Sequence, residues 1–91
     1  MASKSQLSEI QSVKMLQEQF LSLSLIAEKN RSDGDELFAE YFKLADELEA
    51  ALDSDSKTID EIMKLERNFE AARVMLFHFL RHLRVIESNY N

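Results

Sequence analysis

IMKLERNFEAARVMLFHFLRHLRVIESNY, residues 62–90, is the stretch that decides the fold of this 91-residue chain. Apolar residues recur in it at alternating steps of three and four, which is the heptad pattern of a helix packed along a neighbouring helix. Such a seam predicts nearly parallel helix axes, about 20° apart. The members of the seam are Ile62, Leu65, Phe69, Ala72, Leu76, Phe79, Leu83, Ile86 and Tyr90.

Two further amphipathic segments precede this seam, so we expect three helices, over about 5–29, 35–52 and 58–89. Short turns at 29–36 and 53–58 separate them. The first turn holds the only glycine, and each turn carries a capping-box pair, Asp33 with Glu36 and Thr58 with Glu61. The sequence therefore predicts a single all-α domain: an antiparallel three-helix bundle, or a helical hairpin, with a C-terminal helix that outruns the second helix.

The segment FLSLSLIA, residues 20–27, alternates between apolar and polar residues as a β-strand would. We nevertheless interpret it as helix, because the helical periodicity of the preceding residues enters it unbroken and no turn residues bound it. On this interpretation the first helix continues to Lys29.

Composition excludes several classes of protein. The chain has no cysteine, so disulfides and thiolate metal sites are excluded. Its net charge is −6, with residues 33–66 at −9 and residues 67–91 at +2, which argues against binding of nucleic acid by the whole chain. The N-terminus lacks the apolar segment of a secretory signal, and no apolar run reaches the ~18 residues of a membrane span. We expect a cytoplasmic protein that binds neither nucleic acid nor membrane.

Apolar residues also occur away from the predicted core faces. Val74, Phe77 and Met63 fall on the side of the third helix opposite its seam, whereas Met75 and Leu80 flank the seam, where the other helices can cover them. A cluster of exposed apolar side chains from two helices indicates an interface. The predicted partner-binding residues are Met63, Val74, Phe77, Leu21, Leu25 and Phe42, framed by Arg73 and Arg81. The alternative is that the first helix crosses and buries Val74 and Phe77.

His78 and His82 are four residues apart, so both lie on one face of a helix, at the spacing of two metal ligands. No HExxH or ExxH motif accompanies them, and a third ligand would have to come from Glu18, Glu40 or Glu47. The alternative is that the two histidines bind no metal and are simply amphipathic residues at the rim of the bundle. We therefore predict no metal and no cofactor, with His78 and His82 as the only candidate ligands.

Arg73 and His78 form an Arg-x4-His pattern, which resembles the Arg-x4–6-His motif of the HEPN-type helical ribonucleases. The resemblance covers six residues and implies a dimer in which Arg73 and His78 of two subunits cut RNA. In that family a polar residue usually follows the arginine, whereas Val74 follows it here, which puts the resemblance in doubt. No glycine-rich phosphate loop, cysteine nucleophile or distinct acid–base pair is present. The chain is therefore expected not to be an enzyme.

These observations predict a non-catalytic protein–protein interaction module. The partner would be a second copy, giving a homodimer through the third helix, or a different protein. In size, charge and helical build the chain is similar to the small acidic chaperones of bacterial secretion systems, an analogy of fold class alone. An adaptor or chaperone is the first expectation, and an antitoxin or immunity-type inhibitor is the alternative.

Overall fold

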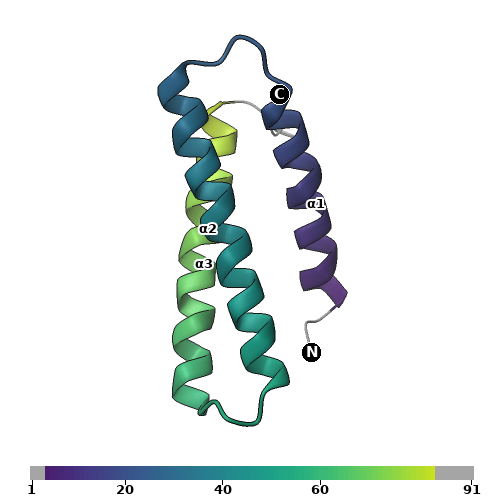
Figure 1. Ribbon diagram of the computed structural model, residues 1–91, viewed down its shortest axis with the longest axis vertical. Coiled ribbons are helices and arrows are strands. Elements are labelled where there is room, and N and C mark those ends of the chain that lie inside the picture. Colours follow the sequence, from purple (N-terminus) through teal and green to yellow (C-terminus); the bar gives the residue numbers. More distant parts are fainter. Residues whose placement is uncertain (1–3, 84–91) are drawn as a thin grey trace.

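A computed structural model describes residues 4–83, and side chains from residue 8 onward. Three helices, α1 (Lys4–Leu21), α2 (Glu28–Asp53) and α3 (Ile59–His82), run up, down and up (Figure 1). Helices α2 and α3 form a tightly packed antiparallel hairpin, and α1 lies beside it with far fewer backbone approaches. The predicted all-α helical bundle is confirmed.

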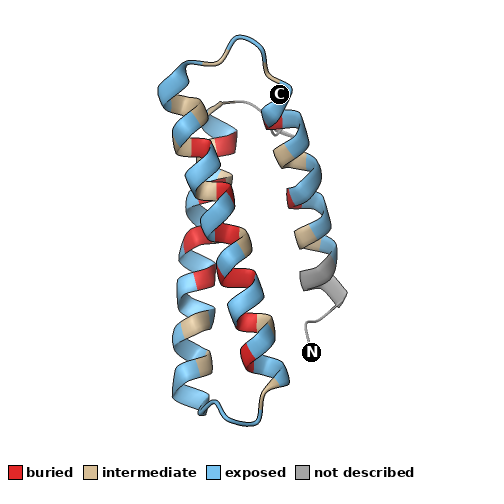
Figure 2. Ribbon diagram, viewed as in Figure 1, coloured by how far each residue is buried: buried red, intermediate tan, exposed pale blue. Residues whose placement is uncertain are grey.

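The core lies where α2 and α3 meet, as Figure 2 shows by the concentration of buried positions along that line. Within residues 62–83 the heptad seam is confirmed. Phe69, Ala72 and Leu76 are buried and the other four members are half-buried against the core, whereas Ile86 and Tyr90 lie outside the described residues. Helix α1 contributes two fully buried side chains, Val13 and Phe20.

The predicted break between the first two helices was wrong. Helix α1 ends at Leu21, and the strand-like segment forms the loop of residues 22–27. The Ser22 hydroxyl donates to the Gln19 carbonyl oxygen at 2.8 Å, which satisfies a carbonyl group in the last turn of α1. Serine favours helix ends over helix interiors because its side chain makes such hydrogen bonds to the nearby backbone. Arg31 then donates from Nη2 to the Leu23 carbonyl oxygen at 2.6 Å, which ties the loop to α2.

Gly34 was expected in a turn but lies inside α2. A glycine is needed at this position because the ring of Phe20 occupies the space that a β-carbon would fill. A β-carbon at Gly34 would lie 2.8 Å from both Cε atoms of that ring and closer still to Cζ. The predicted turn at 29–36 and its Asp33–Glu36 capping box are therefore wrong. With this extension α2 has 26 residues and α3 has 24 in the described chain, so α3 does not outrun α2 there. Its predicted end at residue 89 lies outside the described residues.

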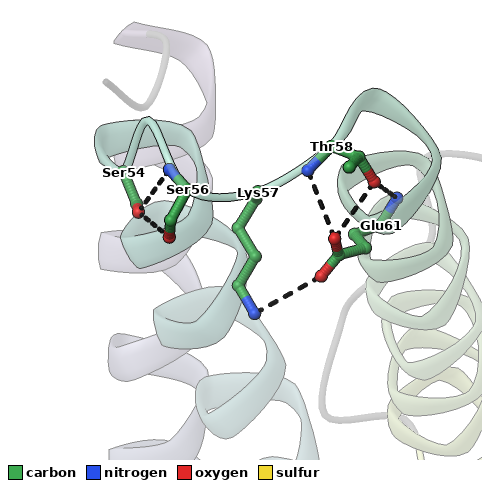
Figure 3. Close-up of polar contacts among 5 residues, drawn as sticks. All are labelled: Ser54, Ser56, Lys57, Thr58 and Glu61. Carbon is green, nitrogen blue, oxygen red and sulfur yellow. Dashed lines mark hydrogen bonds and ion pairs between the residues drawn. The ribbon is translucent and has the colours of Figure 1, made fainter.

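The second predicted turn is confirmed, together with its capping box (Figure 3). Thr58 Oγ1 accepts from the Glu61 backbone N–H at 3.2 Å, and the Thr58 backbone N–H donates to Glu61 Oε1 at 3.3 Å. Lys57 adds an exposed ion pair to Glu61 at 3.7 Å. The hydrogen bonds from the backbone and side chain of Thr58 lower the pKa of the exposed Glu61 carboxyl. Helix α3 therefore starts where the sequence places it.

Candidate functional site

Helix α1 is joined to the hairpin by one polar cluster that draws a residue from each helix. The carboxylate of Glu9 accepts from Tyr41 Oη at 2.9 Å and from Arg73 Nε at 2.7 Å. Arg73 also pairs with Glu70 at 3.2 Å, and its guanidinium lies 5.4 Å from the centre of the Phe77 ring. Arg73 is thus tied to α1 by these contacts while its side chain stays 36% exposed, so a role in framing a partner surface stays a prediction.

Tyr41 is fully buried, and burial is the main reason that its pKa is raised, with the Glu9 carboxylate raising it further. The pKa of Arg73 is also raised, chiefly by its hydrogen bond to Glu9. Both shifts favour the protonated groups that donate to Glu9. The cluster therefore holds α1 in place without needing a proton to move at neutral pH.

Tyr41→Phe is expected to cost about 1 kcal/mol at neutral pH, because the hydrogen bond to Glu9 is lost. Above about pH 10 the unfolded tyrosine ionises whereas the buried one stays protonated, so the wild-type chain loses this stability as pH rises. The difference in free energy of unfolding between the wild type and Tyr41→Phe should narrow in that range. Chemical unfolding at a series of alkaline pH values measures it, and an unchanging gap would contradict the assignment of the raised pKa to Tyr41.

The hollow surface next to the core is a groove between α2 and α3. Two adjoining hollows share Glu40 and Met75, and all their lining residues belong to these two helices. Phe38 on α2 faces the Phe20 ring of α1, and Glu40 follows two residues later, about 200° around the helix. The groove therefore lies on the side of α2 away from α1. It is lined by Asp33, Glu36, Leu37, Glu40, Leu44, Asn68, Ala71, Ala72, Met75 and Phe79.

The floor of the groove is apolar and one wall is acidic. Leu44 and Ala72 are buried, Leu37 and Phe79 are half-buried, and the Met75 side chain is 59% exposed. The three acidic side chains, at positions 33, 36 and 40, all come from α2. In the described part of the chain none of them forms an ion pair with a Lys or Arg side chain. The α3 wall carries no charged residue.

The sequence missed this groove. Met75 was expected to be covered by the other helices, but the structure leaves it exposed, because α1 packs on the other side of the hairpin. Leu80, the other flanking residue, is fully buried as expected. One available signal was the pair Glu36 and Glu40, which are four residues apart and interleave with the apolar spacing of Leu37 and Leu44.

The predicted partner-binding residues of α3 are spread along the helix. Met63 and Val74 are 48% and 54% exposed, and eleven residues place them roughly 16 Å apart along the helix axis. Charged residues, Lys64 and Arg67 among them, lie between them. Phe77 is half-buried against the core, so the alternative that the bundle covers it holds in part for Phe77 and not for Val74. Arg81 is exposed in the last turn of α3.

The remaining predicted residues lie elsewhere in the bundle. Leu21 is exposed at the end of α1, and Leu25 is fully exposed in the loop that follows. Phe42 is half-buried and packs edge-on against the ring of Tyr41, with centroids 5.4 Å apart. A role for these residues in partner binding stays a prediction.

The two candidate metal ligands, His78 and His82, are both exposed on α3. Among residues 4–83 no group of three or more His, Asp or Glu side chains is placed to hold a metal ion. Nor is any helix of that range long and apolar enough to cross a bilayer. The groove has an apolar floor and is walled by two helices, and within the described part of the chain its form suits an amphipathic helix.

Comparison of the chain with models of protein families, with curated proteins and with solved structures finds no match.

Proposed function

We propose that this protein is a non-catalytic protein-binding module that accepts one amphipathic helix of a partner in the groove between α2 and α3. The observation that carries the proposal is the open apolar floor of Leu37, Leu44, Met75 and Phe79 beside a packed hairpin. Helix α1 fills the equivalent position on the other side of the hairpin. A partner helix in the groove would then complete a four-helix arrangement in which both faces of the hairpin are covered.

The dimensions of the groove support this function. Its α2 wall runs from Asp33 to Leu44, about 16 Å or three helical turns. A partner helix of about 12–15 residues would present three or four apolar anchors at steps of three and four over that length. Met75 suits a surface that must adapt to an incoming side chain, because its unbranched thioether has several rotatable bonds.

Self-association through the outer face of α3 is a second candidate, favoured by the exposure of Met63 and Val74. It ranks below the groove because these two side chains are roughly 16 Å apart with charged residues between them. The groove binds through a continuous set of apolar side chains. Adaptor, chaperone and inhibitor roles are all compatible with either surface.

Met75→Glu is expected to weaken binding of an amphipathic helical peptide by about tenfold or more, because burial of a methionine side chain is lost and a charge takes its place. The probe is a pair of ~15-residue peptides with a leucine stripe, flanked by lysines in one and by glutamates in the other. Fluorescence anisotropy measures Kd for each. Met15→Glu is the matched control, since Met15 is 62% exposed on α1 and outside the groove.

Failure of both peptides to bind the wild-type chain would overturn the proposed function, and so would equal weakening by Met75→Glu and Met15→Glu. Light scattering of the same samples tests the second candidate. A dimer that Val74→Glu dissociates and Met75→Glu preserves would place self-association on the outer face of α3.

A further inference from the structure

We propose that the partner helix is basic along one flank, so that the groove selects a cationic amphipathic helix. This inference rests on the proposed function and adds the chemical class of the partner. The groove supplies the apolar contacts, and the carboxylates on one of its walls supply the selection.

Within residues 4–83 no ion pair neutralises the acidic wall. Asp33, Glu36 and Glu40 lie on successive turns of α2 beside the floor, and no Lys or Arg of the described chain pairs with them. By contrast, the Glu9 carboxylate on the α1 side of the bundle is satisfied by Arg73 and Tyr41. The groove carboxylates are therefore available to basic side chains of a partner.

Charge also argues against a second copy of this chain as the partner, docked with its own groove against this one. Two grooves facing each other would place two acidic walls at one interface with no basic lining residue to offset them, and like charges at an interface disfavour association. The segment 33–66, which includes most of α2, carries a net charge of −9, so its long-range field attracts cations and repels acidic helices.

The two walls of the groove differ, and this difference defines the partner further. The α3 wall presents Asn68, Ala71 and Met75, which are neutral, and the small side chain of Ala71 permits close approach of a helix. Lys or Arg is therefore needed only on the flank that lies along α2. Residues four apart on that flank match the spacing of Glu36 and Glu40, because both helices have the same rise per turn.

The test compares two peptides of about 15 residues that share one leucine stripe. One carries lysines on a single flank, and the other carries glutamates there. The lysine peptide is expected to bind the wild-type chain about tenfold more tightly in ~0.1 M salt, from several rim ion pairs of modest strength each. In ~1 M salt the screening length falls from about 10 Å to about 3 Å, and the difference should largely vanish.

Glu36→Lys with Glu40→Lys should reverse the preference. The matched control, Glu18→Lys with Asp46→Lys, makes the same change in net charge at exposed positions that do not line the groove, and should keep it. Glu36→Gln with Glu40→Gln, the gentler change, should remove the preference without reversing it. Circular dichroism checks that each variant keeps its helicity.

The failures are distinguishable. If both peptides bind equally, and Met75→Glu weakens both, the proposed function stands and the selection for a basic helix is overturned. A preference for lysine that the control variant abolishes as fully as the groove variant would also overturn it, because net charge alone would then be responsible. If neither peptide binds, the proposed function itself fails.

Discussion

Phe20→Ala is expected to lower the free energy of unfolding by about 3–5 kcal/mol. The Phe20 side chain is fully buried, and its ring lies 5.6 Å from the centre of the Phe38 ring and 6.1 Å from that of Phe79. It is therefore the one aromatic side chain of α1 in the described core that touches both helices of the hairpin. Truncation removes its burial and leaves a cavity at the end of α1.

Denaturant unfolding measures the loss, and hydrogen exchange shows where it occurs. Because α1 makes few backbone approaches to the hairpin, the faster exchange should be greatest in α1 and smaller in the α2–α3 seam. Phe42→Ala is the control, since Phe42 is half-buried and packs on one ring only, and it should cost less. Equal losses in the two variants would mean that Phe20 does not hold α1.

Gly34→Ala, the second prediction, is expected to destabilise the protein by up to about 2 kcal/mol. Glycine inside a helix ordinarily costs about 1 kcal/mol relative to alanine, so the substitution should stabilise an unobstructed helix. Here the new methyl group would overlap the Phe20 ring, and overpacking of a buried site costs about 1–3 kcal/mol. The clash outweighs the gain in helix propensity because the ring is held between Phe38 and Phe79.

The Phe20→Ala background supplies the control for this prediction. With the ring removed, Gly34→Ala should stabilise the chain by about 1 kcal/mol, the ordinary helix propensity effect. The sign of the change thus depends on whether Phe20 is present, and a double-mutant cycle measures that coupling directly. The same sign in both backgrounds would contradict the close approach of Phe20 to Gly34.

How far the sequence predicts the fold differs among the helices. The seam from Ile62 to Leu83 and the capping box at Thr58 were predicted correctly, because both depend on residues close together in the chain. The first break was predicted wrongly, since Gly34 and its polar neighbours resemble a turn when Phe20 is left out of account. The helix end at Ser22 was missed because the apolar periodicity continues past it. The hydrogen bond from Ser22 to Gln19, which helps to end the helix, cannot be recognised from that periodicity.

The site was predicted less well than the fold. Met63 and Val74 are exposed, as their positions opposite the seam indicate, and the pairing of the half-exposed Arg73 with Glu9 of α1 was not foreseen. Met75 was expected to flank the seam under cover of the other helices, and it lines the open groove instead. Which flank of α3 stays open depends on the side of the hairpin that α1 occupies, and helical periodicity carries no information about that side.

The amino-acid sequence by itself determined that the chain is helical, that α3 packs through a heptad seam along a neighbouring helix, and where α3 begins. These features follow from apolar spacing and from capping groups a few residues apart. Only the tertiary structure decided where α1 ends, why a glycine sits inside α2, and which face of the hairpin remains uncovered. Each of these depends on contacts between residues distant in the chain, such as Phe20 with Gly34 and Glu9 with Arg73, whose geometry no local pattern encodes.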